Sequence, residues 1–273
     1  MKNNQIGIVG VGYWGTNILN VLYKIGVKDI YCHDISIENL KEVKKKFPKV
    51  KIIKNFQDFL NIDFLGVIIA VDTKLHFKIA EKCLNKGFNI FVEKPVTNSS
   101  KKLKLLHKLA VSKNLFIMSG YIYFYNDFIR YIKKIISNNY LGEINYVSCE
   151  RFNLGPVRND VSAAWDLSSH DIAICNYLFD KNLKITNVHG YDFLKKNIND
   201  ISVISAKINK IRLDIKSSWL NPEKIRKIVI VGRKRMLLFN ELDFKNPIKI
   251  YNKYATYPKI SDFKKKFFTQ KAN

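Results

Sequence analysis

The sequence has no long apolar run, and this absence excludes a membrane-spanning helix. Its most apolar stretch, residues 64–71, has only the length of a strand, whereas a helix that crosses a membrane needs about 18 such residues. Residues 1–4 are mostly polar and lead directly into an apolar run, without the profile of a secretory signal. With a mean hydropathy of −0.13, these absences predict a cytoplasmic, water-soluble protein without a membrane partner.

Cysteine is also scarce, and its spacing excludes two kinds of stabilised scaffold. The four cysteines lie far apart and form no Cys-x-x-Cys pair; they are Cys32, Cys83, Cys149 and Cys175. This spacing argues against a disulfide framework and against a zinc site, and it fits a reducing compartment. We therefore predict no bound metal.

Acidic residues are few, 23 against 47 basic ones, which gives a formal net charge of +24. Such a charge can indicate nucleic-acid binding. However, only seven of the basic residues are arginines, and the lysines form short, scattered runs. We interpret the charge as a solvated surface without a nucleic-acid partner, and we expect it to favour anionic ligands. A basic binding protein, the alternative, requires clustered lysines.

The length of 273 residues fits two domains, and the first is predicted from its alternation of strands and helices. Apolar runs typical of strands occupy residues 5–9, 30–32, 50–53, 64–71, 88–92 and 115–118. The helical patterns between them predict an α/β fold, a doubly wound parallel (Rossmann) sheet over residues 1–119. In the first of these patterns one helix face carries Ile18, Val21, Leu22 and Ile25, and we expect this face to pack on the sheet.

Beyond residue 119 strands dominate, and helices are predicted only at residues 127–138 and about 164–178. The predicted strands cover residues 143–152, 200–208, 210–219, 225–231 and 236–239. Within 210–219 apolar and charged residues alternate, as in an antiparallel strand with one buried face. Residues 120–273 are therefore predicted to form an α+β domain with an open-faced, mainly antiparallel sheet.

Three glycines directly follow the first predicted strand. Gly10, Gly12 and Gly15 fit the pattern G-x-G-x-x-G, which binds dinucleotides when it follows a strand and opens a helix. Gly10 allows a tight turn, Gly12 the approach of a pyrophosphate, and Gly15 the close packing of helix and strand. We expect the free N–H groups of Tyr13 and Trp14 to hold the pyrophosphate.

Asp34 stands 19 positions beyond Gly15, just after the second predicted strand. A carboxylate at this spacing accepts hydrogen bonds from the ribose hydroxyls and repels a 2′-phosphate. No arginine stands near it, so the predicted cofactor is NAD rather than NADP. The alternative is a set of turn glycines and a helix-capping Asp34 that bind no nucleotide.

Two further motifs carry candidate catalytic residues. Glu93 and Lys94 end the fifth predicted strand at its carboxyl edge, where doubly wound sheets bind ligands. Asp166 and His170 are four residues apart in a predicted helix and therefore share a face. A carboxylate beside an imidazole raises its basicity, as a general base requires. The alternatives are a surface lysine in a turn, and a surface pair or an incomplete zinc site.

Together these motifs resemble the Gfo/Idh/MocA oxidoreductases over nearly the whole chain. Residues 70–76 are similar to the family's A-T-P-x-x-x-H, although Val71 and Asp72 replace its Thr and Pro. The resemblance implies that the cofactor is contacted by Ala70, Thr73, His76, Glu93 and Lys94. It also implies that Lys94, Asp166 and His170 flank the substrate.

Residues 151–158, placed before Trp165, resemble the branch of nucleotide-sugar and surface-polysaccharide synthesis. The resemblance implies a dehydrogenase that oxidises a secondary hydroxyl of a sugar by hydride transfer to NAD. The scarce arginines Arg151 and Arg158 suit phosphate or carboxylate groups. With Asn153 and Trp165 they are predicted to bind an anionic, nucleotide-linked sugar. The alternative is two surface arginines without this role.

The resemblance also implies pairing through the open sheet face, as a homodimer or homotetramer. Family members continue beyond the last strand with a helix, whereas residues after Ile260 leave length for only a turn or two. The alternative function is therefore a truncated, non-catalytic relative that binds a nucleotide.

Overall fold

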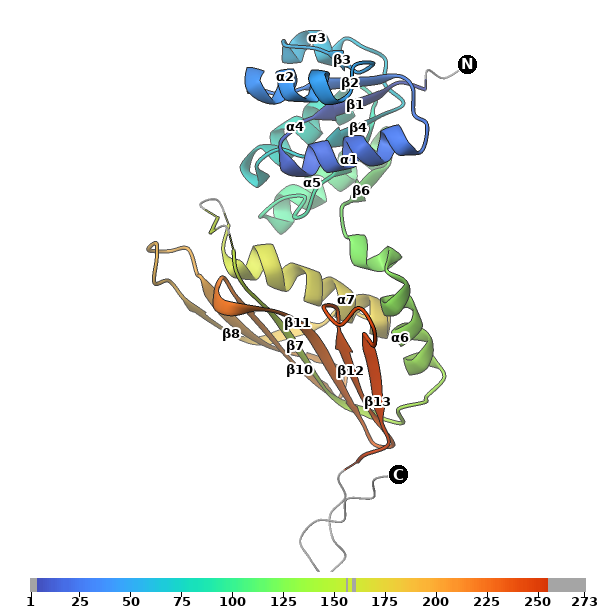
Figure 1. Ribbon diagram of the computed structural model, residues 1–273, viewed down its shortest axis with the longest axis vertical. Coiled ribbons are helices and arrows are strands. Elements are labelled where there is room, and N and C mark those ends of the chain that lie inside the picture. The colour runs from blue at the N-terminus through green and yellow to red at the C-terminus, as the bar shows by residue number, and fades with distance from the viewer. Residues whose placement is uncertain (1–3, 156, 159–160, 255–273) are drawn as a thin grey trace, which may run out of the picture. The chain divides into compact units, whose positions relative to one another are not determined.

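The computed structural model of the protein describes residues 4–155, 157–158 and 161–254. The chain forms two compact units, one up to Tyr121 and one from Ile122 (Figure 1). The predicted C-terminal turns after Ile260 lie outside the described residues. Within the described ranges, no helix combines the length and apolar content that a membrane crossing requires.

The first unit is a six-stranded parallel sheet in the order β3-β2-β1-β4-β5-β6. Its strands are β1 (Ile6–Val9), β2 (Ile30–His33), β3 (Lys51–Ile52), β4 (Gly66–Ile69), β5 (Asn89–Val92) and β6 (Ile117–Ser119). Its helices are α1 (Tyr13–Lys24), α2 (Ile37–Lys46), α3 (Phe56–Leu60), α4 (Thr73–Asn85) and α5 (Ser100–Ser112). The predicted doubly wound fold is confirmed.

Both faces of this sheet are covered by helices. Ile8 of β1 packs in one cluster with Leu19 of α1 and Leu40 of α2. The next residue, Val9, packs in the opposite cluster with residues of α3 and α4, such as Phe59 and Ala80. Successive strand residues point to opposite faces, so a strand covered on both sides must be apolar at every position.

The predicted buried face of α1 is only partly right, since Leu22 packs against the core but Val21 and Ile25 do not. The helix buries Gly15 and Leu19, whereas Val21 and Ile25 are 54% and 69% exposed. The cause is at the helix start, where a Cβ on Gly15 would lie only 1.9 Å from the Gly10 carbonyl oxygen. This contact fixes the rotation of α1, and Leu19, one turn later, then faces the sheet.

The second unit holds a seven-stranded mixed sheet in the order β13-β12-β11-β7-β10-β9-β8. Its strands are β7 (Ile144–Leu154), β8 (Lys184–Tyr191), β9 (Ile201–Ile208), β10 (Ile211–Ser218), β11 (Leu220–Gly232), β12 (Met236–Asn240) and β13 (Ile248–Tyr251). Only β7 and β10 pair in parallel among these strands. The predicted mainly antiparallel sheet is confirmed.

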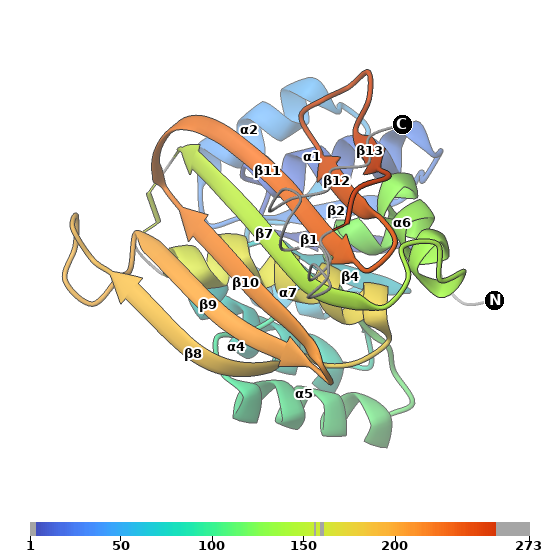
Figure 2. The same ribbon diagram turned by 90° about the horizontal axis from the view of Figure 1, so that it is seen from below.

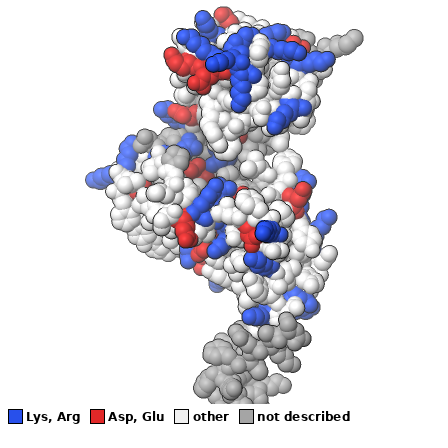
Figure 3. Space-filling view, in the orientation of Figure 1, with Lys and Arg blue, Asp and Glu red and all other residues white. Residues whose placement is uncertain are grey.

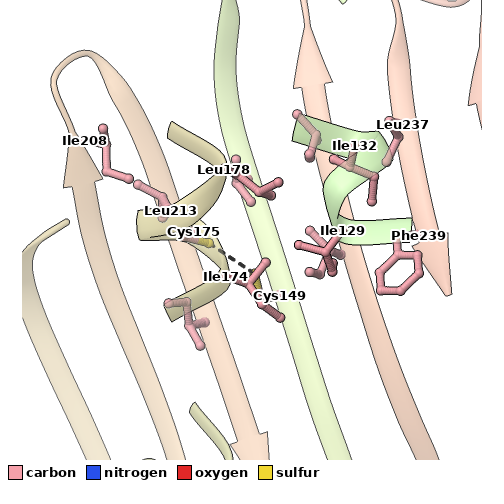
Figure 4. Packing of buried hydrophobic residues seen from close by; sticks show 14 of the residues in the cluster. Ile129, Ile132, Cys149, Ile174, Cys175, Leu178, Ile208, Leu213, Leu237 and Phe239 are labelled. Atoms are coloured by element: carbon pink, nitrogen blue, oxygen red, sulfur yellow. Dashed lines mark hydrogen bonds between the residues drawn. The ribbon is translucent and has the colours of Figure 1, made fainter. Parts of the chain in front are cut away.

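Two helices pack on one face of this sheet, α6 (Asp127–Ser137) and α7 (Ser169–Phe179). The predicted helix 164–178 is divided, because a π-helical turn, η2 (Ala164–Ser168), precedes α7. Cys149 of β7 and Cys175 of α7 meet in the core, with their sulfur atoms 3.8 Å apart (Figure 4). Their hydrogen bond and burial raise the pKa of the Cys149 thiol.

Among the described residues, no helix covers the opposite face of the sheet, which Figure 2 shows from the front. Half-buried apolar side chains there include Val203, Val229 and Leu238. They lie beside polar contacts, since Asp214 accepts hydrogen bonds from Tyr146 Oη at 2.9 Å and Ser205 Oγ at 2.8 Å. The open face therefore mixes apolar and polar groups.

The rotation of α1 generates a stability prediction. Leu19→Ala removes a fully buried side chain, so we expect it to lower the free energy of unfolding by about 2–5 kcal/mol. Ile25→Ala changes a mostly exposed side chain and is expected to cost less than about 1 kcal/mol. Urea denaturation measures both, and equal costs would contradict the orientation of α1.

Candidate active site

The glycine loop between β1 and α1 is held close to the sheet. Gly10 has a φ of +89°, and a Cβ there would lie 2.6 Å from the Ala70 carbonyl oxygen. A side chain at Gly15 would strike Gly10, as described above. Gly12 is different, because a Cβ added there meets no atom within 4 Å. The loop thus leaves open space at the one glycine that is predicted to face a pyrophosphate.

The start of α1 fits an anionic ligand. Gly12 is its N-cap residue and provides no side-chain hydrogen bond to the first turn. The N–H groups of Tyr13 and Trp14 are therefore among those that a helix start leaves for other acceptors. The side chains of these residues are 77% and 55% exposed, and their rings meet edge to face with centroids 5.3 Å apart.

Asp34 is fixed at the side of the glycine loop. Its Oδ2 accepts a hydrogen bond from the Val11 N–H at 2.7 Å, and its Oδ1 accepts one from the Ser36 N–H at 2.8 Å. The Asn39 amide donates to Oδ2 at 3.3 Å. The carboxylate is only partly buried and has one lone pair left, on Oδ1, for a ribose hydroxyl. The residues present therefore fit the adenosine side of a dinucleotide.

The Glu93–Lys94–Pro95 turn follows β5, and the Lys94–Pro95 peptide bond is cis. Burial raises the pKa of Glu93, although the N–H and the charge of Lys94 oppose this. The Lys94 N–H donates to Glu93 Oε2 at 3.2 Å. A Cβ on Gly120 would lie 3.0 Å from the Glu93 carboxylate oxygens, so this glycine gives the carboxylate room beside β6.

His76 was predicted to contact the cofactor, but both of its ring nitrogens lie close to backbone carbonyl oxygens. Its ring is buried, with Nδ1 2.8 Å from the Pro95 carbonyl oxygen and Nε2 2.9 Å from that of Val71. The imidazole thus connects α4 to the end of β4 and to the turn that carries Lys94. Thr73, the first residue of α4, is also buried. The geometry gives His76 a bracing role in this turn.

The candidate acid–base pair lies in the second unit, on η2 and the first turn of α7. Asp166 Oδ2 accepts a hydrogen bond from Trp219 Nε1 at 3.2 Å, and Oδ1 lies 3.6 Å from Arg158 Nη1. His170 is half-buried, and its ring centroid lies 5.2 Å from that of Tyr123 at an interplanar angle of 73°. Both candidate residues are thus held by aromatic side chains.

Arg151 does not have the exposed position that substrate binding requires. It is 4% exposed and donates to both carboxylate oxygens of Asp171, at 3.0 and 2.8 Å, and to Tyr123 Oη at 2.7 Å. The prediction of an anion-binding Arg151 is therefore corrected to a role inside the second unit. The physical reason is strand alternation, which turns Arg151 to the helix-covered face with Val147 and Cys149.

The other predicted substrate residues remain near the surface. Arg158 has a side-chain exposure of 30%, and Trp165 is 44% exposed. Asn153 is half-buried near the end of β7. Sequence reasoning missed Trp219, Tyr123 and Asp171, which hold the candidate residues in place. Among the described residues, no group of three or more His, Cys, Asp or Glu side chains is arranged to hold a metal ion.

The loop, the uncapped helix start and the placed Asp34 define a dinucleotide-binding Rossmann unit. Residues 4–121 match the oxidoreductase family described as Gfo/Idh/MocA, NAD-binding Rossmann fold. A solved structure with similar architecture is the WlbA dehydrogenase from Bordetella pertussis in complex with NADH and UDP-GlcNAcA. It has a TM-score of 0.84 at 18% identity and covers 96% of this chain and 80% of that one. At this identity the likeness shows the fold.

The curated relatives include dehydrogenases of polyols and sugars. The chain is 27% identical over 199 residues to scyllo-inositol 2-dehydrogenase (NADP(+)) IolW of Bacillus subtilis, which covers 67% of this chain and 53% of the relative. It is 25% identical over 178 residues to UDP-N-acetylglucosamine 3-dehydrogenase of Acidithiobacillus ferrooxidans. This match covers 63% of this chain and 53% of the relative. The chain spans about half the length of these relatives. The match to the Gfo/Idh/MocA oxidoreductase family is thus shown for the NAD-binding unit, residues 4–121.

The position of Asp34 generates a cofactor prediction. We expect NAD to bind at least tenfold more tightly than NADP, a difference of ~1.4 kcal/mol, because the carboxylate repels a 2′-phosphate. Asp34→Ser should narrow the gap by weakening NAD binding. Titration calorimetry measures both affinities. Asp29→Ser, at the other end of β2, is the control that should change neither. Equal or reversed preference in the unaltered protein would contradict the prediction.

Proposed function

We propose that this protein is an NAD-dependent dehydrogenase that oxidises a secondary hydroxyl of a sugar. The observation that carries the proposal is that aromatic side chains hold both Asp166 and His170, in a chain whose other unit has an intact dinucleotide loop. Residues 1–119 would bind the cofactor, and residues 120–273 the substrate. When bound, NAD supplies a hydride acceptor.

Three residues of the chain have roles in the proposed reaction. His170 takes the proton of the substrate hydroxyl as the hydride leaves. Asp166 favours the charged imidazolium that results, and Trp219 keeps this carboxylate in place. Lys94 stabilises the negative charge that develops on the substrate oxygen.

Two observations bear on the class of sugar. Arg158 is a partly exposed guanidinium next to Asp166, which supports an anionic, nucleotide-linked sugar. The relative that oxidises UDP-N-acetylglucosamine supports the same class. Because Arg151 is buried, an uncharged polyol is the second candidate, and the similarity to a scyllo-inositol dehydrogenase favours it.

The basic residues support no separate nucleic-acid function. On the face shown in Figure 3, lysines and arginines are spread over the described parts of both units, with acidic side chains between them. The net charge of +24 instead favours anionic ligands of any kind, which includes sugar nucleotides.

The catalytic roles generate a kinetic prediction. Lys94→Ala and His170→Ala should keep NAD affinity nearly unchanged but lower turnover by about 10²-fold or more, because their interactions strengthen as the proton and hydride leave. The assay follows NADH formation with UDP-N-acetylglucosamine, UDP-N-acetylglucuronate and scyllo-inositol.

Lys104→Ala, on the exposed side of α5, is the matched control. Near-normal turnover of either catalytic variant would contradict the site. NAD binding without turnover of any substrate by the unaltered protein would favour the non-catalytic alternative.

We also propose that the open sheet face is the contact between copies of the chain. The uncovered apolar residues Val203, Val229 and Leu238 support this, since such surfaces tend to associate. A two-fold arrangement, as homodimer or homotetramer, lets the same face meet itself. The high net charge opposes assembly at low salt.

The assembly proposal is tested by light scattering at increasing ionic strength. We expect a mass of at least twice 31.8 kDa, with association strengthened by salt. Val229→Glu should weaken it by placing a charge in the apolar contact, whereas Val21→Glu, on the exposed side of α1, should not. A monomer at every salt concentration would refute the proposal.

A further inference from the structure

Five polar side chains from five segments form a connected network under the first turn of α7. They are Tyr123 of the 3₁₀ turn η1 (Ile122–Tyr125), Arg151 of β7, Asp171 of α7, Arg226 of β11 and Glu241, which follows β12. Tyr123, Arg151 and Asp171 are buried, and the network lies next to His170. Its arrangement therefore raises the question of what it does for that residue.

Arg151 is the centre of the network. Its Nε and Nη2 make two parallel hydrogen bonds to Asp171, and its Nη1 donates to Tyr123. Burial lowers the pKa of Arg151, but the charge and hydrogen bonds of Asp171 outweigh burial and raise it, so the guanidinium stays charged. Asp171 is 1% exposed, and its two carboxylate oxygens accept these two bonds. These two parallel hydrogen bonds have a defined geometry, and they therefore restrict how α7 lies against β7.

Tyr123 joins this ion pair to the imidazole. Its hydroxyl accepts from Arg151 and donates to Glu241 Oε2 at 2.8 Å. Arg226 Nη1 donates to the other oxygen of Glu241 at 3.1 Å. Its hydroxyl is held from two sides, and its ring meets the His170 imidazole edge to face, with centroids 5.2 Å apart.

We propose that Arg151 and Tyr123 are positioning residues that keep the His170 imidazole in the orientation needed for proton transfer. The proposal rests on the proposed function of His170. Two contacts lead to the imidazole. Asp171 is the next residue on α7, so its fixation sets the turn from which His170 projects, and Tyr123 supplies the aromatic ring that the imidazole packs against. Arg151 and Tyr123 are both 4% exposed, so they act through His170 rather than on the substrate.

Stability alone is a weak reason for this network. A buried ion pair adds little net stability compared with apolar residues of the same volume. A network in which the donors and acceptors are matched does fix geometry, since any rotation leaves a buried polar group unsatisfied. A fixed geometry of this kind is useful where one side chain, here that of His170, must keep a single orientation.

The test uses the protein alone and a spectroscopic signal from His170. The five histidines are labelled with ¹³C at Cε1, and the His170 resonance is assigned by its loss in His170→Gln. We expect one sharp resonance in the unaltered protein. In Tyr123→Phe and Arg151→Lys we expect this resonance to shift and broaden or split. Tyr146→Phe, which removes a phenol hydrogen bond on the opposite sheet face, should leave it in place.

An unchanged His170 resonance in Tyr123→Phe would overturn the proposal. If Arg151→Lys does not fold, the Tyr123→Phe variant alone tests the proposal, because it removes only a single oxygen atom. The spectrum is recorded without NAD or substrate, so this test does not depend on activity. If the unaltered protein oxidises none of the sugars above, that result counts against the proposed function only.

Kinetics then separate positioning from substrate binding. With whichever of UDP-N-acetylglucosamine, UDP-N-acetylglucuronate or scyllo-inositol is oxidised, Arg151→Lys and Tyr123→Phe should lower kcat by about tenfold and leave KM within about twofold. A rise in KM at unchanged kcat would place Arg151 at the substrate and overturn its positioning role.

Discussion

A buried ion pair constrains the geometry of the second unit. Arg151 and Asp171 are almost completely enclosed and meet through two parallel hydrogen bonds, so each charge depends on the other. Removing one member of such a pair costs about 3–5 kcal/mol, although the intact pair contributes little. The pair therefore ties α7 to β7, and the first turn of α7 carries the candidate residue His170.

The main elements of the fold follow from local pattern, and the exceptions have physical causes. The central strands of the first unit were predictable because strands buried on both faces are continuously apolar. β8 and β13 were not predicted, because they are edge strands; every residue of β8 is exposed and carries no burial pattern. The rotation of α1 was also missed, since a single contact at Gly15 overrides the apolar residues at Val21 and Ile25.

For the candidate site, the sequence predicts what is encoded at short range. The glycine loop and Asp34 follow from spacing along one strand–helix–strand segment. Trp219 is 53 residues from Asp166, and Glu241 is 118 from Tyr123, so no local pattern connects them. Arg151 is the instructive error: it shares the inward alternation of Val147 and Cys149, and this signal was available in the sequence.

The π-helical turn at Ala164–Ser168 has a consequence for how this part of the protein tolerates change. A π-turn holds one residue more than an α-helical path between the same two points. The direction in which the Asp166 side chain points therefore depends on the number of residues in the turn before α7. We expect that deletion of one residue here, other than Asp166, would keep both candidate residues and still turn Asp166 away from Trp219. In this segment, a one-residue insertion or deletion between related sequences is expected to affect the position of Asp166 as much as a substitution would.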